Sequence, residues 1–314
     1  MAGGELPAAD LAQLGHHGGA SCVGTRAAGA EAAARGRIER RRRLADHVIL
    51  DLEDAVAKAE KVPTRASVVQ ALKRPRQGGV KRGGAYVRVN AFTTEFCYGD
   101  AVAVVGPGLD GIVLPMVESR EQIVAFDWLV GALERERGLP PGGIDIIPII
   151  ETAKGIATVR AIAAAGTRVK RMAFGAGDYT LDVNVEWTLG ESELEHARAE
   201  MVVASRAAGL EAPIDTVWVH INDLEGLARS AKRARQLGFQ GKMCIYPPQV
   251  ERVNAAFTPT ETEIAFARRV VAAFEQAERE GSSSIQLDGY FIDYPIVYKA
   301  RRTLDLVRAT AQAT

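Results

Sequence analysis

The amino-acid sequence predicts an α/β protein folded as a TIM-type (β/α)₈ barrel with a C-terminal lid extension. From residue 47 onward, short β-branched runs alternate with longer Ala- and Arg-rich amphipathic segments, which is typical of βαβ units and a parallel sheet. Most runs are continuously apolar, as expected for strands buried on both faces. Polar and charged residues follow the ends of nearly all the runs, and only a barrel brings those ends to one mouth.

The expected strands are 47–51 (HVILD), 85–89 (AYVRV), 111–115 (GIVLP), 145–150 (DIIPII), 171–174 (RMAF), 216–221 (TVWVHI) and 241–246 (GKMCIY). A closed barrel needs one more strand before residue 47, which is poorly recognisable, and 20–24 (ASCVG) is the candidate. The expected helices include 59–73, 118–137, 153–165, 190–209, 223–237 and 260–280. An open doubly wound sheet is the alternative, but the sequence has neither a GxGxxG fingerprint after a strand nor a Walker A loop.

Composition narrows the class of protein. The 314 residues are 47% hydrophobic and 25% charged with a formal net charge of zero, as in an ordinary soluble protein. We therefore expect neither a nucleic-acid nor a membrane partner, since no apolar run approaches the roughly 20 residues that span a bilayer. The three cysteines lie far apart, so we expect free thiols in a reducing, cytoplasmic compartment.

Three segments differ in character. Residues 1–44 form an atypical N-terminal arm that ends in the basic run 37–43, for which we consider disorder or a helix with a solvated basic face. Residues 45–280 carry the barrel. A Gly- and Ser-rich joint then leads into 281–314, the expected lid.

Two apolar strands each run into a carboxylate. The segment 146–150 (IIPII) leads to Glu151, and the segment 171–177 (RMAFGAG) leads to Asp178. For a single carboxylate, a role as a helix cap or as the partner of an arginine is the favoured explanation. A pair on neighbouring strand ends favours a hard divalent cation, because Mg²⁺ commonly takes one or two carboxylates and leaves its other positions to water and substrate.

Arg88 lies inside the apolar strand 85–89, where a charge is costly unless it is paired. Its planar fork suits a substrate carboxylate or a developing enolate oxygen. The alternative is a buried ion pair with Glu53 or Asp54, which follow Asp51 at the end of the preceding strand. We expect Glu53 and Asp54 to orient Arg88 or to hold metal-bound water, while an N-cap role remains an alternative for Asp54.

With these residues in view, the sequence resembles the citrate lyase β-subunit-like family of the HpcH/HpaI aldolase superfamily, over residues 45–302. That group includes citryl-CoA, malyl-CoA and β-methylmalyl-CoA lyases. The motifs that carry the resemblance are ILDLEDAV at 49–56, VRVN at 87–90, GIVLPMVES at 111–119, IIPIIETAKG at 146–155, FGAGD at 174–178, GFQGKMCIYPPQV at 238–250 and FTPT at 257–260. Each motif alone is weak, but their order and spacing make chance similarity improbable.

The resemblance implies a (β/α)₈ barrel that forms a homotrimer or homohexamer, with Mg²⁺ on Glu151 and Asp178. It also implies that Arg88 and Glu151 bind the substrate, and that Asp293 in the lid is the acid/base, with Asp288 as its rival. In many members the lid reaches the active site of an adjacent subunit. The chain departs from the family pattern in its unrecognised first strand, and at two strand ends, where methionine 116 and tyrosine 246 replace a lysine and a histidine.

These observations together predict an enzyme. We expect a Mg²⁺-dependent carbon–carbon lyase that reversibly cleaves a CoA thioester, such as citryl-CoA, malyl-CoA or methylmalyl-CoA, to an acyl-CoA and a small 2-oxo acid. One alternative is a CoA-independent class II pyruvate aldolase of the same superfamily. The other is a non-catalytic accessory subunit that keeps the barrel.

Overall fold

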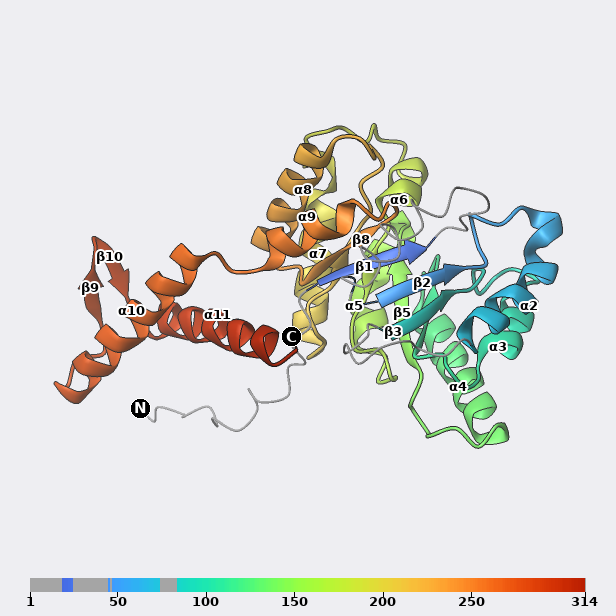
Figure 1. Cartoon of the computed structure of the whole chain (residues 1–314), viewed down its shortest axis with the longest axis horizontal. Helices are drawn as coiled ribbons and strands as arrows, with labels where there is room; N and C mark the ends of the chain where they lie inside the picture. The colour runs from blue at the N-terminus through green and yellow to red at the C-terminus, as the bar shows by residue number, and fades with distance from the viewer. Residues whose placement is uncertain (1–18, 25–44, 46, 74–83, 314) are drawn as a thin grey trace, which may run out of the picture. The chain divides into compact units, whose positions relative to one another are not determined.

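A computed structural model describes residues 19–24, 45, 47–73 and 84–313 of the chain (Figure 1). Eight parallel strands close into a barrel in the order β1 to β8, with β1 paired to both β2 and β8. The strands are β1 (Gly19–Gly24), β2 (His47–Asp51), β3 (Gly84–Arg88), β4 (Gly111–Leu114), β5 (Asp145–Ile150), β6 (Ala173–Phe174), β7 (Ile214–Asp215) and β8 (Gly241–Cys244). The predicted (β/α)₈ barrel is confirmed.

The opening strand, which the sequence shows least clearly, lies where the candidate segment 20–24 predicted it. The remainder of the atypical arm, including the basic run 37–43, lies outside the described residues. One strand prediction is wrong: 216–221 is not a strand, and β7 is the short segment immediately before it. Its single bridge to β6 pairs Ala173 with Ile214, so the chain leaves the sheet early, and Val219 and Ile221 are exposed.

Helices surround the barrel strands (Figure 1). They are α2 (Lys61–Leu72), α3 (Cys97–Val104), α4 (Arg120–Glu136), α5 (Ala153–Ala163), α6 (Ala176–Asp182), α7 (Glu195–Ala207), α8 (Leu224–Leu237) and α9 (Gln249–Phe257), with 3₁₀ turns at η2 (Lys58–Glu60) and η3 (Ser192–Leu194). Side-chain caps begin several of them, because Ser119, Thr152 and Asp223 each accept a backbone N–H of the first turn. No helix among the described residues has the length and apolar character to cross a membrane.

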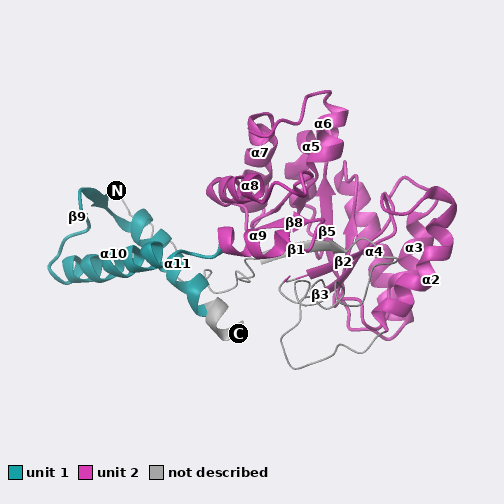
Figure 2. Ribbon diagram, turned by 45° about the horizontal axis from the view of Figure 1, so that its top comes forward, with its two compact units in different colours: residues 1–18, 258–314 teal, residues 19–257 magenta. Residues whose placement is uncertain are grey.

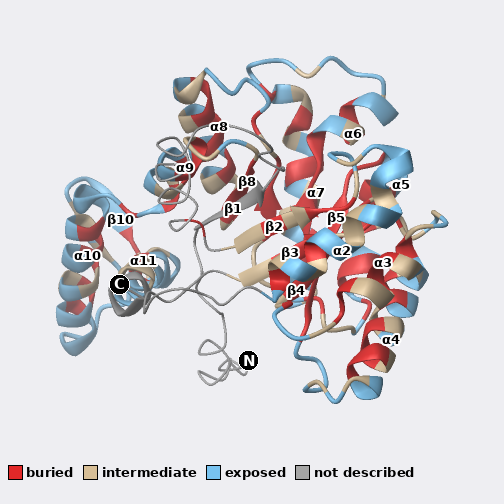
Figure 3. Cartoon of the chain, turned by 45° about the vertical axis from the view of Figure 1, so that its right-hand side comes forward, coloured by how far each residue is buried: buried red, intermediate tan, exposed pale blue. Residues whose placement is uncertain are grey.

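The barrel has two apolar layers. The inner layer fills the space enclosed by the strands, and the outer layer packs between strands and helices, where buried residues dominate in Figure 3. Alternate residues of one strand serve different layers: Ile147 and Ile149 face inward, whereas Ile146 and Ile150 belong to the outer layer. Each such side chain contributes about 1.5–3 kcal/mol when fully buried. This packing explains why β5 is apolar from Ile146 to Ile150.

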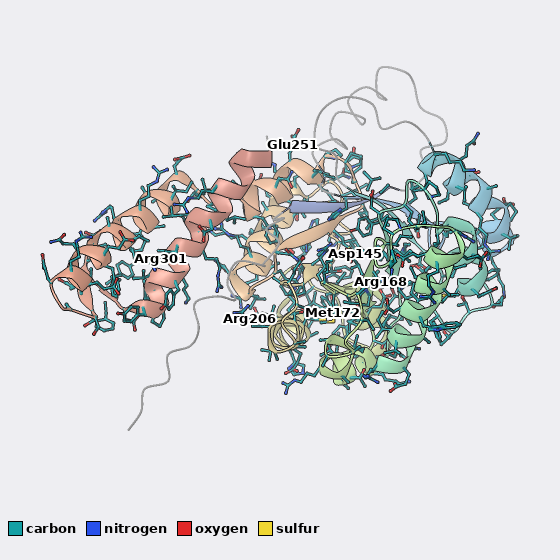
Figure 4. All side chains as sticks on the ribbon, turned by 90° about the horizontal axis from the view of Figure 1, so that it is seen from below. Asp145, Arg168, Met172, Arg206, Glu251 and Arg301 are labelled. Atoms are coloured by element: carbon teal, nitrogen blue, oxygen red, sulfur yellow. The ribbon has the colours of Figure 1, made fainter. Side chains whose placement is uncertain are left out.

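Networks of charged and polar side chains hold two strand ends that lie away from the predicted site residues. Asp145, labelled in Figure 4, begins β5 and accepts hydrogen bonds from Tyr86 Oη at 2.9 Å and Arg171 Nη2 at 2.6 Å. A second network lies under α7, where buried Asp215 accepts Arg198 Nε at 2.9 Å and Lys242 Nζ at 2.7 Å. Removing one partner from such a network leaves an uncompensated buried charge, at a cost of about 3–5 kcal/mol.

The chain divides into two compact units, coloured separately in Figure 2. The barrel unit spans Gly19–Phe257, and the C-terminal unit begins at Thr258, ahead of the boundary expected after residue 280. The C-terminal unit holds α10 (Glu261–Arg279), the antiparallel hairpin β9 (Ile285–Leu287) and β10 (Tyr290–Ile292), and α11 (Tyr294–Ala313). A capping box on Thr260 begins α10, and the apolar core of the unit includes Phe274, Ile292 and Val297.

Candidate active site

Most of the predicted site residues lie at the carboxyl ends of barrel strands. Arg88 ends β3, Glu151 follows β5, and Asp178 lies in the first turn of α6, directly after β6. Glu53 and Asp54 lie in the turn after β2. Since the strands of a parallel barrel end at the same face, the fold brings these residues to one mouth.

The Glu151 carboxylate is buried and held from two sides. Its side chain belongs to a residue that is 4% exposed, and Oε1 accepts the backbone N–H of Met116 at 2.8 Å. The other oxygen, Oε2, lies so close to Gly175 that a Cβ on that residue would approach it to 2.2 Å. Glycine at 175 is therefore required by close approach.

The Met116 backbone adopts the left-handed conformation, with φ of 54°. This conformation is uncommon for a residue with a side chain, and here it accompanies the N–H contact to Glu151. Sequence reasoning identified residue 116 only as a departure from the family pattern. A methionine gives no local signal for a left-handed backbone.

The structure removes the simpler explanations for the two strand-end carboxylates. Thr152, and not Glu151, caps α5 by accepting Gly155 N–H at 2.9 Å. Asp178 lies inside α6, whose N-cap is Gly175. Within the described part of the chain, neither carboxylate forms an ion pair with a lysine or arginine.

The donor set fits a hard cation. Burial and the negative charges of Asp178 and Glu53 together raise the pKa of Glu151 to about 8, although the Met116 N–H and the charge of Arg88 oppose the rise. A divalent cation would relieve this repulsion. No group of three or more His, Cys, Asp or Glu side chains forms a metal cage among the described residues. Mg²⁺ commonly binds one or two carboxylates and completes its coordination with water or substrate. Glu151 and Asp178 would supply the two carboxylates here.

Arg88 is surrounded by acidic side chains. Its Nε and Nη2 pair with Asp51 Oδ1 and Oδ2 at 2.8 and 2.6 Å, and its Nη1 pairs with Glu53 Oε2 at 2.8 Å and with Asp54 Oδ2 at 3.6 Å. The ion-pair alternative considered for Arg88 is therefore present in this structure, with Asp51 as an additional partner.

Burial and the guanidinium act in opposite directions on these acids. Burial would raise the pKa of Asp51, but hydrogen bonds and the charge of Arg88 outweigh it and lower that pKa. Burial and the neighbouring carboxylates of Asp54 and Asp51 together raise the pKa of Glu53 to about 7, despite the attraction of Arg88. The N-cap alternative for Asp54 is not observed, because Ala57 and Glu60 occupy the N-cap positions of the following helical turns.

Asp51 is the site residue that sequence reasoning underrated. In the sheet it lies directly opposite Arg88, as the β2 and β3 register pairs the two residues. Both of its oxygens also accept backbone N–H groups, from Glu53 at 3.0 Å and Ala55 at 3.1 Å. Its side chain is 3% exposed, so the pair with Arg88 is largely shielded from water.

The two candidate acid/base residues lie in the C-terminal unit. Asp293 precedes α11, and its Oδ1 accepts the Ile296 N–H at 3.4 Å, as an N-cap residue does. Asp288 forms the β9–β10 turn with Gly289, both at positive φ, and it pairs with Arg269. An Asp-Gly turn of this kind is a common hairpin connection, which gives Asp288 a structural role.

Comparison with known proteins gives a consistent result. Residues 39–247 match the family model described as HpcH/HpaI aldolase/citrate lyase. The citrate lyase subunit beta of Leuconostoc mesenteroides subsp. cremoris is 39% identical over 265 residues, covering 84% of this chain and 86% of that protein. The L-malyl-CoA/beta-methylmalyl-CoA lyase of Cereibacter sphaeroides is 33% identical over 279 residues, covering 82% and 85%. The solved structure of CitE from Mycobacterium tuberculosis in complex with magnesium, acetoacetate and coenzyme A has a TM-score of 0.70 at 28% identity, covering 92% and 97%.

Proposed function

The chain belongs to the HpcH/HpaI aldolase/citrate lyase family, and from this premise we propose a Mg²⁺-dependent cleavage of a CoA thioester to an acyl-CoA and a 2-oxo acid. The resemblance drawn from the sequence motifs is confirmed, and the relatives named as lyases support a carbon–carbon lyase that acts on a CoA ester. Citryl-CoA, malyl-CoA and methylmalyl-CoA are the proposed substrates, because the relatives are named citrate lyase and malyl-CoA/methylmalyl-CoA lyase.

The observation that carries the proposal is the Glu151 carboxylate. It is buried, close to the negative charge of Asp178, and free of any lysine or arginine partner in the described residues. Mg²⁺ bound there would act as a template and Lewis acid for the 2-oxo acid. A solved structure of CitE contains magnesium and acetoacetate, which supports the choice of cation.

The side chains have distinct proposed roles. Glu151 and Asp178 hold the cation. Arg88 binds an anionic oxygen of the substrate and stabilises the enolate that forms as the carbon–carbon bond breaks. Asp293 exchanges a proton with the methyl carbon of the acyl-CoA. Its role, and that of the segment 281–314 as a lid, rest on the family resemblance, as do a homotrimeric or homohexameric assembly and a cytoplasmic location.

A coupled assay tests the proposal. Purified protein is offered acetyl-CoA or propionyl-CoA with glyoxylate, and malyl-CoA or citryl-CoA in reverse, while mass spectrometry follows free CoA and the carbon–carbon product separately. We expect product only with Mg²⁺, and none from Glu151→Ala. Product that persists after chelation, or in that folded variant, would refute the role of the site.

The same assay separates the alternatives. A class II pyruvate aldolase would join pyruvate to an aldehyde with no CoA ester present. An accessory subunit would fold and bind Mg²⁺ yet turn over neither set of substrates. The match to the CoA-ester lyases, over more than four fifths of the chain, favours the CoA-dependent reaction.

A further inference from the structure

We propose that the guanidinium of Arg88 is divided between two carboxylates with opposite roles. Asp51 is a permanent positioning residue that fixes Nε and Nη2. Glu53 is a displaceable partner that occupies Nη1 until an anionic oxygen of the substrate replaces it. The inference rests on the proposed function, because it takes the 2-oxo acid as the anion that arrives.

The permanent partner is distinguished by its contacts. Asp51 meets Arg88 through two parallel hydrogen bonds, at 2.8 and 2.6 Å, in the fork-to-fork geometry that fixes a guanidinium most strongly. Its two oxygens accept two backbone N–H groups as well. Releasing Asp51 would therefore break four hydrogen bonds in a buried place, so we expect this pair to persist throughout the reaction.

The displaceable partner is held much less firmly. Glu53 meets Arg88 through Oε2 alone, at 2.8 Å, and the same oxygen accepts only a long 3.2 Å contact from the Asp54 N–H. Its side chain is 15% exposed, against 3% for Asp51. Rotation of one side chain thus exposes Nη1 and leaves the fork with Asp51 intact.

The turn that carries Glu53 is anchored, so its backbone need not move. Lys61 Nζ donates to the carbonyl oxygens of Leu52 and Glu53 at 3.4 and 2.9 Å. Buried Asn90 donates from Nδ2 to the Leu52 carbonyl at 3.0 Å. The exchange at Arg88 is therefore confined to the Glu53 side chain.

The charge balance favours such an exchange. Three carboxylates face one guanidinium, so the cluster is two charges negative whenever all three are ionised. A further anion cannot pair with Nη1 while Glu53 occupies it. Asp54 presents the same charge, but at 3.6 Å and with its side chain 67% exposed, so solvent screens most of its effect.

The test measures pyruvate affinity by calorimetry on the full-length protein at saturating Mg²⁺. Removing the competitor in Glu53→Gln should tighten pyruvate binding about threefold to tenfold. The matched variant Asp54→Asn removes the same charge from the same turn and should change the affinity less than twofold. Asp51→Asn, which loses the fork, should weaken binding about tenfold or more.

The opposite signs for positions 51 and 53 carry the test. Weaker or unchanged pyruvate binding in Glu53→Gln overturns the inference, and equal tightening in Asp54→Asn shows a general charge effect and overturns it as well. Mg²⁺ affinity is titrated in each variant, since a loss in Glu53→Gln would make Glu53 a metal-site residue instead. Failure of the proposed function is separate, because wild-type protein would then give no product in the coupled assay.

Discussion

Gly175→Ala tests the candidate metal site without replacing a charged residue. The backbone at 175 has φ of −111° and ψ of 99°, which alanine adopts freely, so any effect must come from space. The new Cβ would meet Glu151 Oε2 at 2.2 Å, about 1.2 Å closer than the ordinary contact limit of 3.4 Å. It would also lie 2.7 Å from Glu151 Cβ and 3.0 Å from Ile149 Cγ2.

The carboxylate has little room to retreat, because Glu151 is 4% exposed. Overpacking of this kind costs about 1–3 kcal/mol, while replacing a glycine returns about 0.4–1 kcal/mol through the unfolded chain. We expect a net loss of about 1–2 kcal/mol in the free energy of unfolding. Displacing one of two anionic ligands should weaken Mg²⁺ binding at least tenfold, or about 1.4 kcal/mol.

Chemical denaturation gives the stability, and calorimetric titration gives the Mg²⁺ affinity. The shift of the melting temperature with added Mg²⁺ is an independent readout, since a ligand stabilises the folded state according to its affinity. Gly177→Ala is the matched control in the same motif. Its Cβ would find no atom nearer than Trp187 Cζ3 at 3.9 Å, and alanine stabilises a helix by up to about 1 kcal/mol over glycine.

We therefore expect Gly175→Ala to lower the free energy of unfolding and to weaken Mg²⁺ binding. Gly177→Ala should raise the free energy of unfolding and leave Mg²⁺ binding unchanged. If Gly175→Ala binds Mg²⁺ as tightly as the wild type does, either Glu151 is not a ligand or it does not lie against residue 175. If both variants lose the cation equally, the motif acts through its backbone flexibility and the steric reasoning fails.

Three further predictions follow from other contacts in the structure. Met116→Gly should keep its Mg²⁺ affinity and gain about 0.5–1 kcal/mol in the free energy of unfolding, because only the backbone N–H of residue 116 contacts Glu151 and glycine adopts a positive φ freely. Met116→Val should lose both Mg²⁺ affinity and stability, because valine resists a positive φ. Calorimetric titration measures the Mg²⁺ affinity, and chemical denaturation measures the stability. Charges of Lys242 and Arg198 hold the pKa of Asp215 below its unfolded value of about 4 although burial opposes them. The stability contributed by Asp215 is therefore present above about pH 4 and lost as the pH falls further, and Asp215→Asn should show lower stability at neutral pH with a flatter acid limb in denaturation curves. Asp293→Asn should abolish turnover with little change in melting temperature, because asparagine also caps helices, whereas Asp288→Asn should stay active; equal activity of both would remove Asp293 as the acid/base.

A strand could be predicted correctly where its own sequence determines its bounds, and not where neighbouring strands determine them. The strand β5 was predicted residue for residue, because the apolar run 146–150, bounded by Asp145 and Glu151, marks a buried strand by itself. The strand β7 was predicted two residues too late, because its position is set by its pairing with β6 and β8. Strand length there depends on neighbours distant in sequence, which periodicity cannot report.

The site shows the same division. Glu151 and Asp178 could be predicted, since each carboxylate directly ends a recognisable apolar segment. The fork between Asp51 and Arg88 could not, because it depends on the register of β2 against β3, and a shift of one residue would turn Asp51 to the other face. Among three nearby acids, the sequence had no means to choose the one that lies opposite the arginine.

Two buried carboxylates at the same end of the barrel, Asp51 and Glu151, have pKa values shifted in opposite directions. Burial opposes ionisation in both, so the difference comes from their partners. Asp51 forms an ion pair with Arg88, whereas Glu151 has a single backbone donor, and the attraction of Arg88 is weaker there than the repulsion from Asp178 or Glu53. An ionised Glu151 at neutral pH therefore calls for a cation from outside the chain, and Mg²⁺ affinity should rise with pH as the proton and the metal compete for this carboxylate.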